Sequence, residues 1–202
     1  MTGNTIFIPG STSGIGLALA IALHERGNEV IVGGRRAALL DQIAREYPGI
    51  DTVRIDTADA ASIEAAAKEV LARHPDLNVL VAMAGVMRVE DWRQPSSFLA
   101  DAEEVVTTNL LGPIRLQLAG TSVKVVELEP PSVRTSLLPG QEDSEFAMPL
   151  EDFTAEVMSL LETQPEATEI QVERVKFLRY GEARGDYETV VATLNHLDPH
   201  GQ

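Results

Sequence analysis

The pattern of apolar and polar residues switches repeatedly between short apolar runs and stripes with the period of a helix. Apolar runs predict strands over 5–8, 29–33, 52–55, 77–82 and 122–129, and alternating apolar residues over 169–177 predict a strand with a bend. Apolar residues recur every three or four positions, as in amphipathic helices, over 14–26, 37–47, 60–74, 98–118 and 151–162, and 185–197 is expected to form a polar terminal helix. Residues 137–149 carry neither pattern and are expected to form a loop. This alternation predicts an α/β fold, a doubly wound parallel sheet of Rossmann type in three layers, formed as one domain over residues 1–202.

The first predicted strand leads into a glycine-rich turn that opens the first helix. Its glycines, Gly10, Gly14 and Gly16, have the spacing G-x-x-x-G-x-G. Free N–H groups at a helix N-terminus hold anions, and glycine lets the main chain approach a diphosphate closely. The residues expected to contact a dinucleotide here are Gly10, Ser11, Ser13, Gly14, Ile15 and Gly16. The alternative is an ordinary tight turn between strand and helix.

Two arginines, Arg35 and Arg36, follow the second strand directly. In a dinucleotide-binding fold this position faces the adenosine ribose, where an acidic residue binds the 2′-hydroxyl and arginine suits a 2′-phosphate. Gly34 occupies the place of the acidic residue, so the sequence favours NADP(H) over NAD(H). The alternative is that both arginines are solvated at the start of a helix.

Further candidate residues lie at the carboxyl ends of the next strands, where ligands bind in open α/β sheets. Asp56 and Thr57 end the third strand, and Asp59 is a suitable N-cap for the helix that follows. Ala84 and Gly85 form a turn after the fourth strand. The polar stretch 88–95, with the only tryptophan, is either a loop at the mouth of the site or a surface loop with one anchoring aromatic residue.

Composition narrows the possible partners. A net charge of −15 disfavours nucleic acid and anionic membranes as partners. The chain has no cysteine, no apolar run long enough to span a bilayer and no basic leader, so we expect no disulfide, no metal site and a cytoplasmic location. The four histidines, His24, His74, His196 and His200, are expected on the solvated surface.

These motifs together resemble the short-chain dehydrogenase/reductase family. The segment Pro9–Gly16 resembles the family's T-G-x-x-x-G-x-G, with proline in place of threonine. The segment Ala82–Gly85 resembles N-N-A-G with both asparagines replaced, and 130–135 resembles P-G-x-V-x-T beside the nicotinamide. The resemblance therefore adds Pro130, Val133 and Thr135 to the cofactor-binding residues. It also matches Asp56 to the residue set against the adenine, and Asn109 to the first member of the Asn-Ser-Tyr-Lys catalytic tetrad.

The other three tetrad members have no counterpart. Between about Leu116 and Gln117 the chain lacks the segment that the resemblance implies, one strand and most of two helices, roughly 50 residues by ordinary element lengths. No tyrosine has lysine four residues later, and Tyr180 with Arg184 is the nearest arrangement. That pair follows the last strand, far from the nicotinamide in the family's topology, and is not expected to be catalytic. The lost strand would leave the fourth strand to pair with Val123–Leu128 or to remain as an exposed edge.

Three interpretations stay open. The chain is an NAD(P)(H)-binding oxidoreductase, acting on CH–OH or C=O groups, whose catalysis is impaired or lost because the proton donor and the donor to the carbonyl oxygen are absent. Alternatively, the written sequence omits a segment of an active NADP-dependent reductase, or the protein is a nucleotide-binding module without enzymatic activity. The sequence does not indicate the small-molecule substrate. The family's dimer helices are interrupted, so a homodimer would depend on pairing through 169–177.

Overall fold

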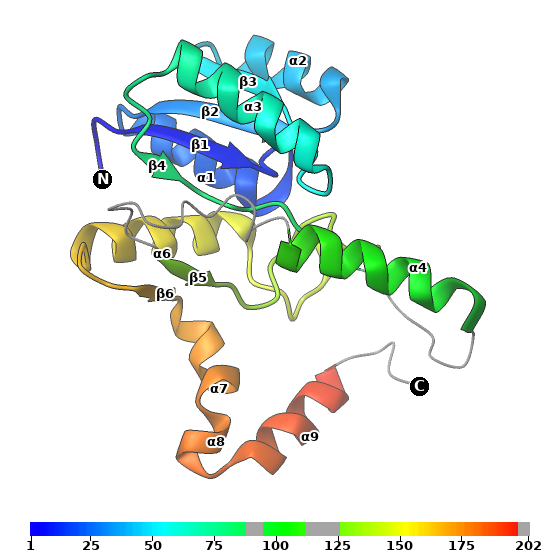
Figure 1. Ribbon diagram of the computed structural model, residues 1–202. Helices are drawn as coiled ribbons and strands as arrows, with labels where there is room; N and C mark the ends of the chain where they lie inside the picture. Colours follow the sequence, from blue (N-terminus) through cyan, green and yellow to red (C-terminus); the bar gives the residue numbers. More distant parts are fainter. Residues whose placement is uncertain (88–94, 112–125, 198–202) are drawn as a thin grey trace. The chain divides into compact units, whose positions relative to one another are not determined.

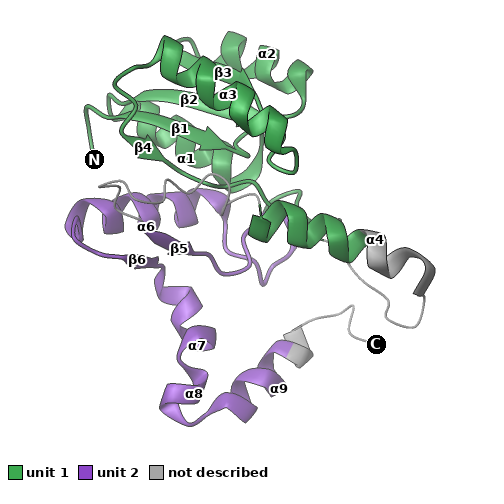
Figure 2. Ribbon diagram, in the orientation of Figure 1, with its two compact units in different colours: residues 1–123, 135–139 green, residues 124–134, 140–202 purple. Residues whose placement is uncertain are grey.

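The computed structural model describes residues 1–87, 95–111 and 126–197 (Figure 1). Its contacts divide the chain into two compact units, shown in different colours in Figure 2. Unit 1 contains Met1–Val123 and Thr135–Pro139, and unit 2 contains Lys124–Arg134 and Gly140–Gln202. The expected single domain over 1–202 stays a prediction.

Unit 1 is built on a parallel sheet. Its strands are β1 (Thr5–Pro9), β2 (Glu29–Gly34), β3 (Ile50–Arg54) and β4 (Val79–Leu80). The strand order is β3-β2-β1-β4, and each neighbouring pair is parallel. The first three strands agree closely with the apolar runs, whereas β4 is shorter than the run 77–82 that predicted it.

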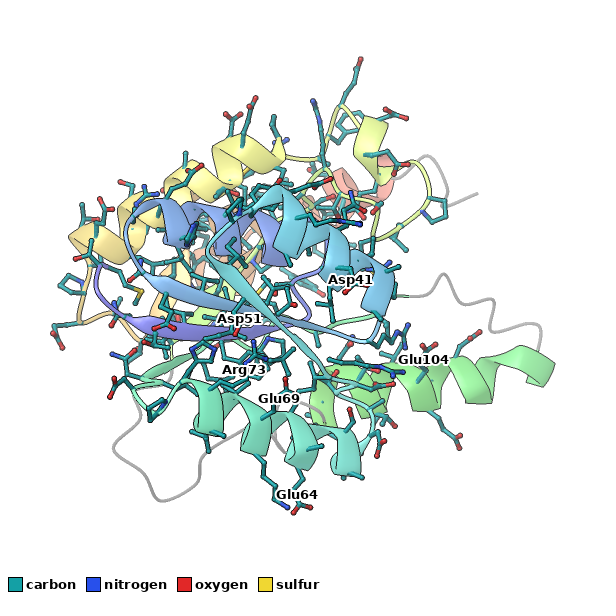
Figure 3. All side chains as sticks on the ribbon, turned by 90° about the horizontal axis from the view of Figure 1, so that it is seen from above. Asp41, Asp51, Glu64, Glu69, Arg73 and Glu104 are labelled. Atoms are coloured by element: carbon teal, nitrogen blue, oxygen red, sulfur yellow. The ribbon has the colours of Figure 1, made fainter. Side chains whose placement is uncertain are left out.

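Helices follow the first three strands in turn. They are α1 (Gly14–Glu25), α2 (Ala37–Glu46) and α3 (Ala60–Arg73), and α4 (Pro95–Val106) continues into a π-helical turn at Thr107–Leu111. As predicted, Asp59 caps α3 by accepting a hydrogen bond from the N–H of Ala61. Figure 3 shows α3 on one face of the sheet and α1 and α2 on the other. This is the doubly wound arrangement that the sequence predicts.

The sheet carries the core of unit 1, because its central strands are covered on both faces. One face packs against α3 through a cluster formed by Phe7, Ile31, Val53, Ile55, Ile63, Ala66 and Val70. Residues of opposite parity on β1 and β2, such as Ile8 and Val32, are buried as well. Burial on both faces explains why these strands read as continuous apolar runs.

Unit 2 contains a small parallel sheet and several short helices. The strands β5 (Glu127–Glu129) and β6 (Glu169–Gln171) pair with each other. The helices are η2 (Gln141–Asp143), α6 (Leu150–Thr163), η3 (Glu173–Val175), α7 (Lys176–Arg179), α8 (Gly181–Arg184) and α9 (Tyr187–Leu197). Phe153, Val157 and Met158 of α6 form much of the buried surface of this unit.

The predicted strand over 169–177 is mostly wrong. The run 169–177 is a strand only over Glu169–Gln171, and helical turns follow it. The buried residues Val172 and Val175 are three positions apart, which fits a helical turn, and the N–H of Glu173 bonds to Glu156 Oε1 at 2.6 Å instead of continuing a ladder. Of the two alternatives for β4, pairing with Val123–Leu128 is not seen in the described residues, where β5 pairs with β6, and residues 122–125 lie outside them.

The prediction of a solvated His74 is also wrong. This residue ends α3, is only 9% exposed, and bridges two strands at the amino edge of the sheet. Its Nδ1 lies 2.7 Å from Oε1 of Glu29, and its Nε2 lies 2.7 Å from Oδ2 of Asp51. Arg73 also pairs with Asp51 and, at 2.7 Å, with Glu69, as the labelled side chains in Figure 3 show. The side chain of His24 is half-buried, and those of His196 and His200 lie outside the described residues.

This charged cluster predicts acid sensitivity. Partial burial alone would raise the pKa of Asp51, but the hydrogen bonds from His74 and the Thr52 N–H and the charge of Arg73 hold it below the usual 3.8. A carboxyl group whose pKa is lower in the folded than in the unfolded protein stabilises the fold at pH values above its unfolded-state pKa. That stabilisation is lost as the pH falls through the folded-state pKa. In Asp51→Asn, the free energy of unfolding measured with urea should therefore depend less steeply on pH below about pH 4 than in the wild type. Asp41→Asn, an exposed change on α2, should leave this dependence unaltered.

The described helices include none that combines the length and apolar character of a membrane span. A cytoplasmic location stays a prediction.

Candidate nucleotide site

The corner between β1 and α1 is closely packed at a glycine. Gly10 has φ +86°, and a Cβ there would lie 2.3 Å from both the Cα and the N of Ala84. The N–H groups of Gly10 and Ser11 both donate to the carbonyl of Gly33, at 2.9 and 3.1 Å. The buried Ser11 hydroxyl donates to the carbonyl of Ile8. The corner is thus held against β2 and against the chain that follows β4.

No capping side chain binds the N–H groups in the first turn of α1. The N-cap residue Ser13 makes no side-chain capping bond, and no acidic residue lies in the first turn. Gly16 packs tightly, since a Cβ there would lie 2.8 Å from the Gly10 carbonyl oxygen and from Ser11 Cα. An uncapped N-terminus on a glycine corner matches what a bound diphosphate requires.

The end of β2 is shaped by Thr12, a residue that sequence reasoning missed. A Cβ at Gly34 would lie 2.4 Å from Cγ2 of Thr12, so Thr12 would have to shift to admit a side chain at position 34. Nη2 of Arg36 donates to Thr12 Oγ1 at 2.9 Å and lies 3.3 Å from Ser13 Oγ. This guanidinium therefore lies over the loop expected to bind phosphate. Thr12 could have been predicted from the sequence, because it lies between Gly10 and Gly14 in the glycine-rich turn.

A cavity of about 420 Å³ lies at the carboxyl ends of β2 and β3. Its lining is formed by Arg35, Arg54, Asp56, Asp59, Ser62, Ala65, Ala66 and Glu69. The Asp56 carboxylate accepts from the Ala58 N–H at 3.0 Å, and the Asp56 N–H donates to Ser62 Oγ at 2.9 Å. Thr57 beside it is buried. Arg54 was not anticipated, although its pairing with Gly34 in the ladder places it beside the predicted arginines.

Asn109 lies on the π-helical turn that follows α4, where it binds the backbone after β4. Its Oδ1 accepts from the Val86 N–H and its Nδ2 donates to the Val86 carbonyl, each at 2.8 Å. A Cβ at Gly85 would lie 3.6 Å from the same Oδ1. The side chain of Asn109 is therefore a clamp on the turn that carries Ala84 and Gly85.

The structure brings most, but not all, of the predicted residues together in unit 1. Ile15 is half-buried on α1. Gly14 lies close to Thr135, since a Cβ added at Gly14 would be 3.5 Å from the methyl group of Thr135. Pro130 and the buried Val133 belong to unit 2, where Val133 bridges to Met148. The predicted gap between Leu116 and Gln117, and most of the stretch 88–95, lie outside the described residues.

Comparison with known proteins settles the family. Residues 4–121, more than half of the chain, match the family model described as short chain dehydrogenase. The chain belongs to the short-chain dehydrogenase family. The resemblance drawn from the motifs is thereby confirmed.

Named relatives match only part of this short-chain dehydrogenase. It is 39% identical over 116 residues to the uncharacterized oxidoreductase DltE of Bacillus subtilis, covering 57% of this chain and 46% of that protein. It is 38% identical over 66 residues to L-xylulose reductase of Bos taurus, and the match covers 33% of this chain and 27% of that protein. The chain therefore spans less than half the length of these curated relatives.

Solved structures agree on the fold. An alcohol dehydrogenase from Thermococcus sibiricus, complexed with 5-hydroxy-NADP, has a TM-score of 0.70 at 22% identity, covering 83% of this short-chain dehydrogenase and 95% of that chain. A short chain dehydrogenase from Burkholderia cenocepacia, in complex with NADP, has a TM-score of 0.71 at 18% identity. The match covers 96% of this chain and 98% of that chain. An NADPH-bound carbonyl reductase from chicken fatty liver has a TM-score of 0.50 at 31% identity. The match covers 57% of this chain and 49% of that chain.

Proposed function

We propose that unit 1 binds NADP(H) as the cofactor domain of a short-chain dehydrogenase-type oxidoreductase. The uncapped N-terminus of α1, formed on a corner that only glycine can occupy at position 10, is the observation that carries this proposal. The residues fit the cofactor, because the first turn of α1 has no capping side chain and glycine lets the main chain approach a diphosphate closely.

Each part of the cofactor has its own residues in this proposal. The N–H groups of the first turn, from Gly14 to Gly16, hold the diphosphate. The cavity lined by Arg35 and Asp56 takes the adenosine end. The turn at Ala84 and Gly85, clamped by Asn109, lies on the nicotinamide side, together with Thr135. When bound, the cofactor supplies the hydride, and the protein positions and protects it.

The preference for NADP(H) over NAD(H) follows from the end of β2. Position 34 is glycine with Thr12 packed against it, so this position offers no carboxylate for a 2′-hydroxyl. Arg36 extends over the same loop with its guanidinium held by two hydroxyl groups. A fixed guanidinium is well suited to a 2′-phosphate. Three neighbours in fold or sequence are described with NADP-type nucleotides, which supports the same choice.

Arg36→Gln should weaken NADPH binding by about 10-fold and leave NADH binding within about 2-fold, because only NADPH carries the extra phosphate. Fluorescence titration of both nucleotides measures the ratio. Arg45→Gln, which removes another exposed arginine, one on α2, serves as the matched control and should change neither affinity. Equal losses for NADPH and NADH in the Arg36 variant would contradict the assigned preference.

We further propose that these 202 residues turn over carbonyl substrates poorly. The tyrosines are Tyr47, Tyr180 and Tyr187, and none has lysine four residues later. The hydroxyl of Tyr180 donates to Gln171 Oε1 at 2.6 Å within unit 2. A chain without a positioned proton donor loses about 10²–10⁴-fold in rate. The clamp by Asn109 orders the backbone but donates no proton to a substrate.

The test pairs NADPH titration with NADPH oxidation over a panel of aldehydes and ketones. Binding with little or no oxidation is the expected result. Rapid oxidation would favour the alternative of an active reductase whose written sequence omits a segment. Absence of binding would refute the assignment of unit 1 as a cofactor domain.

A further inference from the structure

The cavity at the carboxyl ends of β2 and β3 is lined by an arginine from each of two chain segments. Arg54 is the last residue of β3, and its partner in the parallel ladder is Gly34, the residue that precedes Arg35. Neighbouring strands lie about 4.8 Å apart, so the two arginines leave the sheet at adjacent positions. Both are exposed, and both line the cavity of about 420 Å³. Two positive charges therefore border a single cavity.

Neither Arg35 nor Arg54 forms an ion pair or a hydrogen bond within the part of the chain that the structure describes. This is notable because 31 acidic side chains are available to 16 basic ones. Arg73, Arg179 and Arg184, for example, each pair with a carboxylate. The two arginines of the cavity are thus free to bind an anion that comes from outside the chain.

The acidic side chains in the same lining are bound within their own segments. Asp56 and Asp59 accept hydrogen bonds from main-chain N–H groups two residues further along, each at 3.0 Å. Glu69 pairs with Arg73 at 2.7 Å, and Figure 3 labels both side chains. An incoming anion therefore has no existing ion pair of the two cavity arginines to displace.

The chemistry of the two arginines indicates which anion they bind. A phosphate monoester carries nearly two negative charges and three terminal oxygens, which two guanidinium groups can share through paired N–H donors. A single carboxylate has one charge and two oxygens, and one arginine is enough to bind it. In a dinucleotide-binding fold, the residues after β2 face the adenosine ribose, so the 2′-phosphate of NADP(H) is the phosphate expected at this cavity.

We propose that Arg54, together with Arg35, binds the 2′-phosphate of NADP(H), which makes Arg54 a residue that determines the choice between NADP(H) and NAD(H). This inference rests on the proposed function, because it assumes that unit 1 binds the cofactor. Arg36 is held by Thr12 and Ser13 over the glycine-rich loop and contributes its remaining donors from there. The edge strand β3 thus supplies a contact that only the phosphorylated cofactor can use.

Arg54→Gln should weaken NADPH binding about 10-fold and leave NADH binding within about 2-fold, as measured by fluorescence titration. Arg45→Gln is the matched control, because Arg45 is also exposed and without a partner among the described residues but does not line the cavity. It should leave both affinities unchanged. A ratio of NADPH to NADH affinity that stays at the wild-type value in the Arg54 variant would overturn the role of Arg54.

Adenosine 2′-phosphate tests the cavity separately from the glycine corner, because this fragment has neither a diphosphate nor a nicotinamide. The wild type should bind it at least about 10-fold more tightly than adenosine, and Arg54→Gln should remove most of that difference. Equal binding of the two fragments by the wild type would overturn this inference. If NADPH and NADH still bound the wild type, the proposed function would stand, whereas failure of both nucleotides to bind would refute the proposed function itself.

Discussion

Replacing Gly10 with alanine should abolish NADPH binding, with a loss of affinity of at least about 100-fold. Two effects combine at this position. A residue other than glycine is strained at φ +86°, and the new Cβ would lie 2.3 Å from backbone atoms of Ala84, which no rotamer can avoid. The corner must therefore move away from the chain after β4, and the N–H groups of α1 move with it. NADPH titration measures the loss, and circular dichroism shows whether the variant is folded.

Gly27→Ala is a closely matched control. Gly27 has φ +78°, but nothing lies within 4 Å of the Cβ that alanine would add. The substitution therefore carries the same backbone strain, about 1–2 kcal/mol, without the clash, at the far end of α1. NADPH affinity should remain within about 2-fold of wild type. If both variants lost binding equally, strain alone and not the close approach at Gly10 would explain the effect.

The second large effect concerns stability. Ile31→Ala should lower the free energy of unfolding by about 3–4 kcal/mol. Ile31 lies on β2 between two neighbouring strands, is 0% exposed, and packs in the cluster that joins the sheet to α3. Removing three side-chain carbons there loses apolar burial and leaves a cavity that fixed strands fill poorly. Because β2 ends in the residues that shape the nucleotide site, weaker NADPH binding should accompany the loss. Urea unfolding measures the stability change.

Leu71→Ala tests whether burial causes this loss. Leu71 lies on α3 in the same unit but is 55% exposed. Its truncation removes the same number of carbon atoms from a site that is largely solvated already, so the change should stay below about 0.5 kcal/mol. Comparable losses in the two variants would mean that the core of unit 1 is not where the structure places it.

The first half of the chain could be predicted well because each element there carries a local signal. Strands such as β1 and β2 are buried on both faces, and an apolar run is the direct consequence. Asp59 predicted the start of α3, and the glycine spacing predicted the turn at Gly10. What the pattern could not supply is the partner of each residue. Thr12 over Gly34 is a contact between residues 22 positions apart, and no period in the sequence encodes it.

The second half was predicted less well because short elements depend on tertiary contacts. The apolar residues at Val172 and Val175 fit a bent strand or a helical turn, and the bond from the Glu173 N–H to Glu156 on α6 decides for the turn. Likewise, His74 carries no local sign of burial. Only the fold brings Glu29 and Asp51 to its two ring nitrogens, since these residues precede it by 45 and 23 positions.

Isothermal titration of the 202-residue chain with NADPH, repeated with NADH, tests the central claim most directly. If the glycine corner holds the diphosphate and Arg36 the 2′-phosphate, NADPH should bind at one site per chain with a dissociation constant of about 1–100 μM, and NADH about 10-fold more weakly. No heat of binding for either nucleotide up to about 1 mM would contradict the account.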